Sequence, residues 1–137
     1  MLNLQAWVDR VSTDQIAAGL ASTVDAASQL RTLPSMLVLP GREIVENQAL
    51  VGGPGARHKV VTEVLVMTAV PRGNRSLGGE ARDELNALRK PMLMSLINWQ
   101  PEDVDVGITW QEGRLVSLSS NALVWTDRFR TEYWWSL

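Results

Sequence analysis

The sequence predicts an α+β fold, with one mostly antiparallel β-sheet and helices packed on one of its faces. Residues 60–70 (VVTEVLVMTAV) are apolar and β-branched in both phases, which is typical of a central strand. Residues 123–137 alternate apolar and polar side chains, and residues 80–99 carry an apolar stripe of helical period. Strands and helices in this order favour one sheet with helices on one side. We find no internal repeat or linker, so we expect a single domain over residues 1–137.

Two short helices are expected in the N-terminal third. Apolar residues recur at helical spacing in the first of them: Leu4, Trp7, Val8 and Val11. Thr23 is a suitable N-cap for a second helix over residues 23–30. The stretch between them, residues 14–20, fits either a helical turn or a short edge strand.

A strand and a long polar segment precede the central strand. Residues 36–39 are wholly apolar and end at Pro40-Gly41, which predicts a short strand covered on both faces. Residues 42–59 are expected to form a long loop, although a strand could begin within residues 43–48. The glycine-rich residues 52–56 should form its mobile tip. Pro71 ends the central strand, and residues 72–79 are expected to form a polar turn region.

The longest helix is predicted over residues 80–99. Its stripe consists of Ala81, Leu85, Leu88, Met92, Leu96 and Trp99, and Pro91 inside it is expected to kink the helix. A loop with three acids should follow at residues 98–106. Two short strands, residues 108–111 and 114–118, are then expected to pair across a turn at Glu112-Gly113, with a further turn at residues 119–121.

The last strand presents a length problem. Its apolar phase, which holds most of its aromatic side chains, should face the core. At about 3.3 Å per residue it would span about 50 Å, whereas a domain of this length is only about 35–40 Å across. The strand must therefore bend, bulge or run beyond its own domain.

Asp127 interrupts the apolar phase of this strand. A buried carboxylate must be paired or must accept backbone hydrogen bonds. We consider two explanations: a bulge that turns Asp127 outward and kinks the strand there, or an ion pair between Asp127 and an arginine of a neighbouring subunit. The bulge is the favoured explanation.

The composition narrows the class of protein. A formal charge of −2 argues against a general nucleic-acid binder. The sequence has no cysteine, which removes disulfides and thiolate metal sites. It also has no apolar run of the ~20 residues needed to span a bilayer, and residues 1–10 lack the order of a signal peptide. We therefore expect a soluble protein made in a cytoplasm.

No catalytic site, metal site or cofactor is predicted. His58, the only histidine, has no neighbouring ligand in sequence. The acids Glu102, Asp103 and Asp105 lack calcium-loop spacing, so a solvated turn is a better interpretation than a cation site. An alternative function, as a small-molecule-binding or enzymatic domain, would require Arg72, Arg75, His58 and Asp127 to converge in one pocket.

Three stretches, taken together, resemble a known family. They are LPSMLVLP at residues 33–40, ELNALRKPMLMSLINWQP at residues 84–101 and GRLVSLSSNALVWTDRFRTEY at residues 113–133. This pattern resembles the tail-terminator proteins of long-tailed bacteriophages, especially those of Mu-like phages. The resemblance implies a tail-terminator-like α+β subunit, similar in fold to the tail terminator of phage lambda.

The resemblance also implies a function without chemistry or cofactor. Six copies would form a ring that caps the tail tube, stops its polymerisation and joins it to the head connector. The implied partners are other copies of the chain, the tail-tube protein and the head-connector (stopper) protein, with DNA passing through the lumen without sequence-specific binding and no membrane involved. The expected location is the virion, at the head–tail junction, after assembly in the host cytoplasm. Another head–tail connector or neck protein is the alternative.

Candidate contact residues come from the polar phase of the last strand and from the loops. The candidate subunit or tube interface comprises Arg72, Arg75, Asp127, Arg128, Arg130 and Trp134. The candidate contact loop comprises Gly52, Gly53, Gly55, Arg57 and His58. In a ring, Arg128, Arg130 and Trp134 are expected to face a neighbouring subunit.

Overall fold

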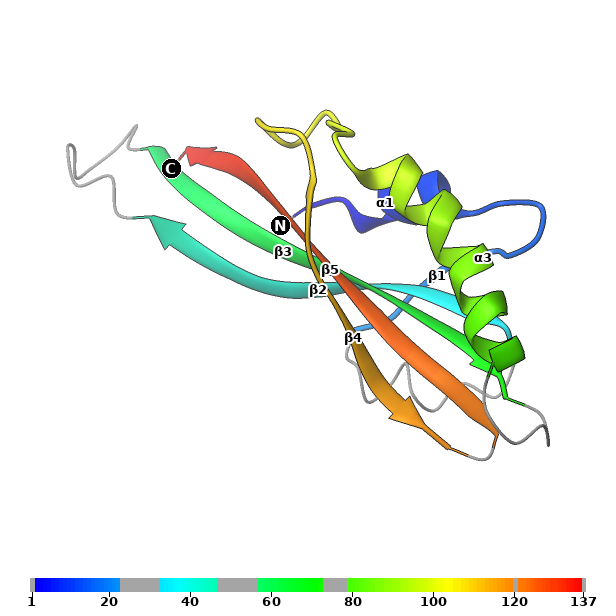
Figure 1. Cartoon of the computed structure of the whole chain (residues 1–137). Helices are drawn as coiled ribbons and strands as arrows, with labels where there is room; N and C mark the ends of the chain where they lie inside the picture. The colour runs from blue at the N-terminus through cyan, green and yellow to red at the C-terminus, as the bar shows by residue number, and fades with distance from the viewer. Residues whose placement is uncertain (1, 23–32, 47–56, 73–78, 120, 137) are drawn as a thin grey trace.

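A computed structural model describes residues 2–22, 33–46, 57–72, 79–119 and 121–136 (Figure 1). Within them lie the helices α1 (Leu4–Val11) and α3 (Gly79–Leu96), and the strands β1 (Gly19–Leu20), β2 (Ser35–Glu46), β3 (Arg57–Pro71), β4 (Thr109–Leu118) and β5 (Ala122–Ser136). The strands form one sheet in the order β1-β2-β3-β5-β4. β1 is parallel to β2, and all other pairs are antiparallel. The predicted α+β class and mostly antiparallel sheet are confirmed.

Both helices pack on the same face of the sheet (Figure 1). The Asn3 side chain caps α1 by accepting the Gln5 N–H, and the predicted stripe of α1 is buried at Trp7, Val8 and Val11. α3 buries Ala81, Leu85, Leu88, Met92 and Leu96, as its periodicity predicts, and Pro91 lies inside it. Neither helix is long and apolar enough to cross a membrane. The predicted second helix, residues 23–30, lies outside the described residues.

β3 is central, as its apolar sequence predicts, because it pairs with β2 on one side and β5 on the other. Alternate side chains of β3 point to opposite faces of the sheet and belong to two different hydrophobic clusters. Val60, Val64, Val66 and Val70 face the helices, whereas Met67 and Ala69 join a smaller cluster with Leu37 and Leu39 on the opposite face. We call this second side, which carries no helix among the described residues, the open face.

β2 is longer than predicted. Pro40-Gly41 does not end it; the strand continues to Glu46, and its register shifts between Pro40 and Glu43. Such a bulge accommodates Pro40, which has no N–H to donate. At Gly41, a Cβ would lie 2.7 Å from the carbonyl oxygen of Glu63, so the two backbones approach too closely for any other residue. Within the segment predicted as a long loop, residues 42–46 and 57–59 are strand, and the alternative of a strand within residues 43–48 is correct as far as Glu46. The predicted tip at residues 52–56 lies outside the described residues.

β4 is one strand, so the predicted turn at Glu112-Gly113 is wrong. Glu112 and Gly113 instead pair with Arg128 and Asp127 of β5. β4 ends at Leu118 and β5 begins at Ala122, on either side of the predicted turn, and the Ser119 N–H donates to the Ala122 carbonyl at 2.9 Å. Of the two alternatives for residues 14–20, the short edge strand is correct, at Gly19–Leu20.

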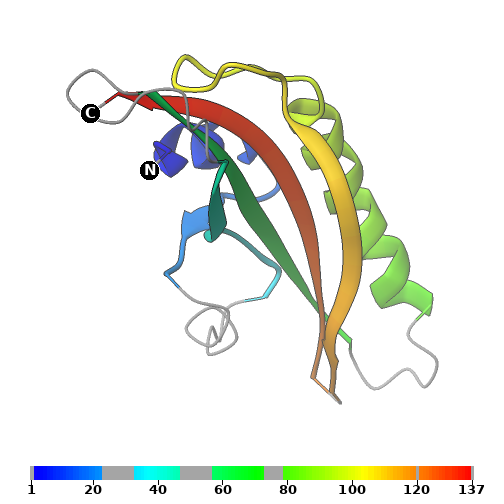
Figure 2. The same cartoon turned by 90° about the vertical axis from the view of Figure 1, so that its left-hand side faces the viewer.

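β5 is longer than the expected diameter of the domain, and it is accommodated because the strand curves and extends past the helices. Its pairing with β3 is continuous from Ala122 to Ser136, so it contains no bulge at Asp127 and the predicted kink there is wrong. The extra residues lie in β4, one between Trp110 and Glu112 and one between Leu115 and Ser117. Figure 2 shows β5 curving along its whole length, and in Figure 1 the ends of β2, β3 and β5 nearest the C-terminus extend beyond the helices. We call this projecting end the distal tip.

Candidate functional site

Asp127 is fully buried on the helix-facing side of β5 and is bound by three side chains. Arg89 of α3 donates from Nε to Oδ2 at 2.9 Å and from Nη2 to Oδ1 at 2.7 Å. Trp110 and Trp125 donate their indole N–H groups to Oδ1 at 3.2 and 3.3 Å. The Arg89 guanidinium also lies 4.8 Å from the centroid of the Trp125 ring, at a distance suited to a cation–π contact. Both explanations offered for Asp127 are therefore wrong. Its side chain is buried and does not turn outward at a bulge, and its arginine partner belongs to its own chain.

Gly113 makes room for this cluster. A Cβ at Gly113 would lie 2.9 Å from Asp127 Oδ1, 3.0 Å from Trp125 Nε1 and 3.1 Å from Arg89 Nη2. Glycine at this position therefore lets β4 pass directly over a buried ion pair. Sequence reasoning missed Arg89, which is 38 residues from Asp127. Two features of the sequence could have indicated this pair. Arg89 follows Leu88 of the apolar stripe of the helix, and Asp127 lies among the apolar residues of the last strand.

The open face carries a row of alternating charges across four strands. Arg42 of β2 pairs with the buried Glu63 of β3. Glu63 Oε2 also lies 3.1 Å from Arg128 Nη1 of β5, and Arg128 Nη2 lies 3.0 Å from Glu112 Oε2 of β4. We call these four residues the charge ladder. Arg128, a candidate interface residue, thus has acidic partners within its own subunit.

A second group of charges lies on the same face. Lys59 Nζ is 3.1 Å from Glu132 Oε2 and 3.5 Å from Glu46 Oε2. The hydrogen bond to Glu132 is the main reason why the pKa of Lys59 is raised. Arg130, another candidate interface residue, pairs with Glu132 at 3.2 Å.

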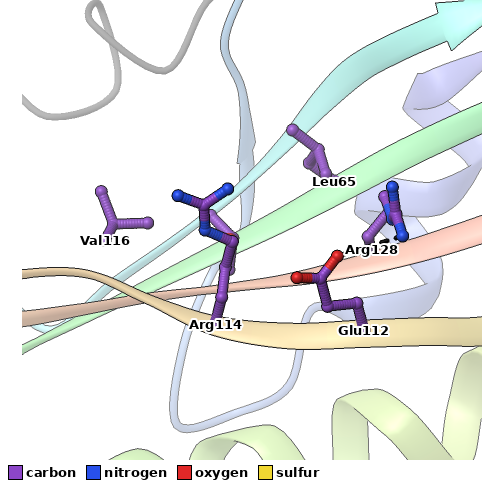
Figure 3. A pocket seen from close by; sticks show the side chains of 6 residues that line it. Leu65, Glu112, Arg114, Val116 and Arg128 are labelled. Atoms are coloured by element: carbon purple, nitrogen blue, oxygen red, sulfur yellow. Dashed lines mark ion pairs between the residues drawn. The ribbon is translucent and has the colours of Figure 1, made fainter.

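A hollow of about 350 Å³ opens beside the charge ladder (Figure 3). It is lined by Leu65, Glu112, Arg114, Val116, Thr126 and Arg128. In Figure 3 Arg128 and Glu112 face each other as an ion pair, while Arg114 extends over the hollow from β4. Arg114 is exposed and has no acidic partner among the residues that the structure describes.

The distal tip exposes apolar side chains on both faces of the sheet. On the helix-facing side Val45 and Trp135, 58% and 49% exposed, line an almost wholly apolar hollow with His58 and Val60. On the open face Trp134 is 38% exposed, and the Arg57 guanidinium lies 5.1 Å from its ring centroid. The candidate residues Arg57 and Trp134 are thus in contact on the open face, and His58 lies at the same tip on the helix-facing side.

The candidate residues do not form the single pocket that the small-molecule alternative requires. Arg72 follows the end of β3 near the β4–β5 turn, where it donates from Nη1 to the Ser119 carbonyl at 3.1 Å. His58 lies at the opposite end of β3, and Asp127 is buried between them. Three of the four residues are therefore apart, and that alternative fails. Arg75, Gly52, Gly53 and Gly55 lie outside the described residues.

Two acids of the loop before β4 bind backbone donors. Asp103 Oδ2 accepts the Asn3 N–H at 2.8 Å, and Asp105 Oδ2 accepts the Trp134 N–H at 2.9 Å. Among the described residues, no group of three or more histidine or acidic side chains is arranged to hold a metal ion. The geometry assigns these two carboxylates to fastening α1 and the distal part of β5.

Tyr133 is expected to resist ionisation in the folded protein. Burial raises its pKa to about 12, helped by the hydrogen bond from its hydroxyl to Glu43 Oε1 at 2.9 Å. Because the folded pKa exceeds the unfolded value of about 10, the neutral phenol contributes stability below pH ~10 that is lost as pH rises through about 12. Tyr133 is the only tyrosine, so tyrosinate absorbance should titrate near pH 12 in folded protein and near 10 in denaturant.

The variant Glu43→Gln is the matched control for this titration. It should lower the folded midpoint only in part, because burial is the larger cause of the shift. Circular dichroism of the same samples reports whether the protein remains folded. A midpoint near the unfolded value in folded wild-type protein would contradict the assignment.

The chain was compared with known protein families and with curated proteins. A family model described as "Phage tail terminator protein" matches residues 2–135. A search of curated proteins finds no match. The matched range contains every helix and strand described above, apart from the last residue of β5.

Proposed function

The chain belongs to the phage tail terminator family, and from this premise we propose that six copies form a ring that caps the tail tube. Family membership makes it a structural protein of the phage tail, with other phage proteins as partners. The proposed ring stops tube polymerisation and joins the tube to the head connector, and DNA passes through its lumen. We further propose assembly in the host cytoplasm, with residues 1–137 acting as one domain of the type found in Mu-like phages and similar to the lambda terminator.

The match over residues 2–135 is the observation that carries this proposal. The distal tip supports it, because exposed tryptophans beyond the subunit's own core are typical of protein interfaces. A ring needs two different contact patches on each subunit. At about 800 Å² each, two patches would take about a fifth of the 8323 Å² surface of one subunit.

Purified protein mixed with tail-tube protein tests the proposal. We expect light scattering and negative-stain microscopy to show rings, either free or at the ends of tubes. Adding the protein during tube assembly should stop elongation. A protein that stays monomeric and never binds tube ends would refute the proposal, whereas rings that bind only the head connector would favour a neck protein instead.

Substitution of both tip tryptophans, Trp134→Ser with Trp135→Ser, should abolish or weaken capping while leaving the fold intact. Interface tryptophans often contribute 2 kcal/mol or more, which is a roughly 30-fold loss of affinity. Binding to tube ends is measured by co-sedimentation. Met94→Ser, on the outer surface of α3 and 72% exposed, is the matched control and should bind normally. Equal binding by the tip variant and the control would remove the tip from the interface.

A further inference from the structure

The sheet has two unpaired edges among the residues that the structure describes. β4 pairs only with β5, so its outer backbone groups have no strand partner. β1 covers β2 only around Leu37 and Val38, which leaves residues 39–46 open. Unpaired strand edges readily pair with another chain. β4 also exposes Trp110, Leu115 and Leu118 at this edge and contains neither lysine nor proline.

The strand directions suit a head-to-tail joint between these edges. From β2 through β3 and β5 to β4, each strand is antiparallel to the one before. Rotation about a ring axis leaves unchanged the component of each strand's direction that lies along that axis. The β2 of the next copy, placed beside β4, would therefore be antiparallel to it, and the alternation would continue without a break.

The charge ladder is complementary at its two ends. It ends in Arg42 at the β2 edge, with a side chain 70% exposed, and in Glu112 at the β4 edge, with a side chain 46% exposed. A cation at one edge and an anion at the other allow the ladder to continue from copy to copy. Both side chains project from the open face, so they would meet on the same side of a shared sheet.

We infer that neighbouring copies join by antiparallel pairing of β4 with residues 39–46 of the next copy, and that Glu112 there binds Arg42 of the partner copy. This inference rests on the proposed ring and names its subunit contact. Six copies with four strands each, about 4.8 Å apart, give a ring roughly 37 Å across at the backbone. The bulkier helix layer would lie outside, and the open face, which carries the charge ladder, would line the lumen.

Cysteine cross-linking tests the joint directly, because the natural chain has no cysteine. Opposed residues of antiparallel strands lie at Cα distances of about 4.5–5.5 Å, within the range that a disulfide spans. On oxidation, the double variant Arg42→Cys/Glu112→Cys should give a ladder of covalent oligomers up to the closed ring. Each single variant should stay uncross-linked, and an equimolar mixture of the two single variants should stop at covalent dimers.

Charge reversal provides a second measurement. Arg42→Glu alone and Glu112→Arg alone should each fail to self-associate, because like charges meet at every joint. Mixing them should restore rings of alternating copies, in which every joint is again complementary. Circular dichroism of each variant shows that loss of association is not loss of folding.

Three outcomes overturn the inference. A single-cysteine variant that links to itself would indicate a two-fold contact, such as β4 against β4. Rings without the cross-link, in solution or on tube ends, would place the joint elsewhere, even though the capping function would stand. Absence of both rings and cross-links would refute the joint and the ring together. Conversely, cross-linked rings that ignore tube ends would leave the joint intact and refute the capping function.

Discussion

Asp127→Ala is expected to lower the free energy of unfolding by about 3–5 kcal/mol, the usual cost of removing one partner from a buried ion pair. The Arg89 side chain is only 15% exposed, so the variant would leave a largely buried cation without its carboxylate. The indole N–H groups of Trp110 and Trp125 would lose their acceptor as well. The contact between α3 and β5 would weaken. Urea denaturation followed by tryptophan fluorescence measures the loss.

The double variant Arg89→Met/Asp127→Leu distinguishes two contributions to the free energy of unfolding: the cost of leaving Arg89 buried without a partner, and the net stabilisation by the ion pair. Replacing both charges with apolar groups of similar size should recover much of the stability lost in Asp127→Ala. Asp9→Ala, which removes an exposed carboxylate on α1, should change stability by no more than about 0.5 kcal/mol. If Asp127→Ala behaved like this control, the cluster would not be a stabilising contact.

Trp7→Ala is expected to cost about 3–5 kcal/mol, the range for deleting a large aromatic side chain from a core. Trp7 is fully buried, and its ring centroid lies 5.8 Å from that of Trp99 and 6.3 Å from that of Phe129. The side chain therefore connects α1 with the segment after α3 and with β5. Its loss would leave a cavity where these three segments meet.

Trp7→Phe provides the informative comparison. Trp7 Nε1 is buried and has no hydrogen-bond partner among the described residues. Phenylalanine removes this unsatisfied donor, so the variant should cost clearly less than Trp7→Ala. Met94→Ala, on the exposed face of α3, serves as a control for truncation without burial. Equal losses for Trp7→Phe and Trp7→Ala would show that ring size at this position outweighs the polar group.

Much of the fold could be predicted because its patterns are local. The stripe on α3 and the apolar run of β3 each identify an element and its buried face without reference to the rest of the chain. Errors arose where local rules conflict with tertiary pairing. Pro40-Gly41 and Glu112-Gly113 both have the composition of chain turns, yet each glycine lies within a strand. A Cβ has no room there, because the Glu63 backbone lies against Gly41 and partly or fully buried side chains lie against Gly113.

The partners of the candidate contact residues within the subunit could not be predicted, for a related reason. The sequence placed Arg128, Arg130 and Trp134 together in the polar phase of the last strand, and the structure places all three on the open face. It could not show that Arg128 and Arg130 already have acidic partners on β3, β4 and β5. Such pairing depends on strand order, which periodicity alone does not specify.

The sequence by itself determined the α+β class, the central strand, the stripes of both described helices and the resemblance to a tail terminator. Only the tertiary structure decided the partner of Asp127, the length of β2 and the charge ladder. The physical reason is that burial of one face of a helix or strand requires apolar residues at regular spacing, and this pattern can be seen within one segment of the sequence. An ion pair such as Arg89–Asp127, or a close approach such as Gly113 over Asp127, involves groups that only the folded chain brings together.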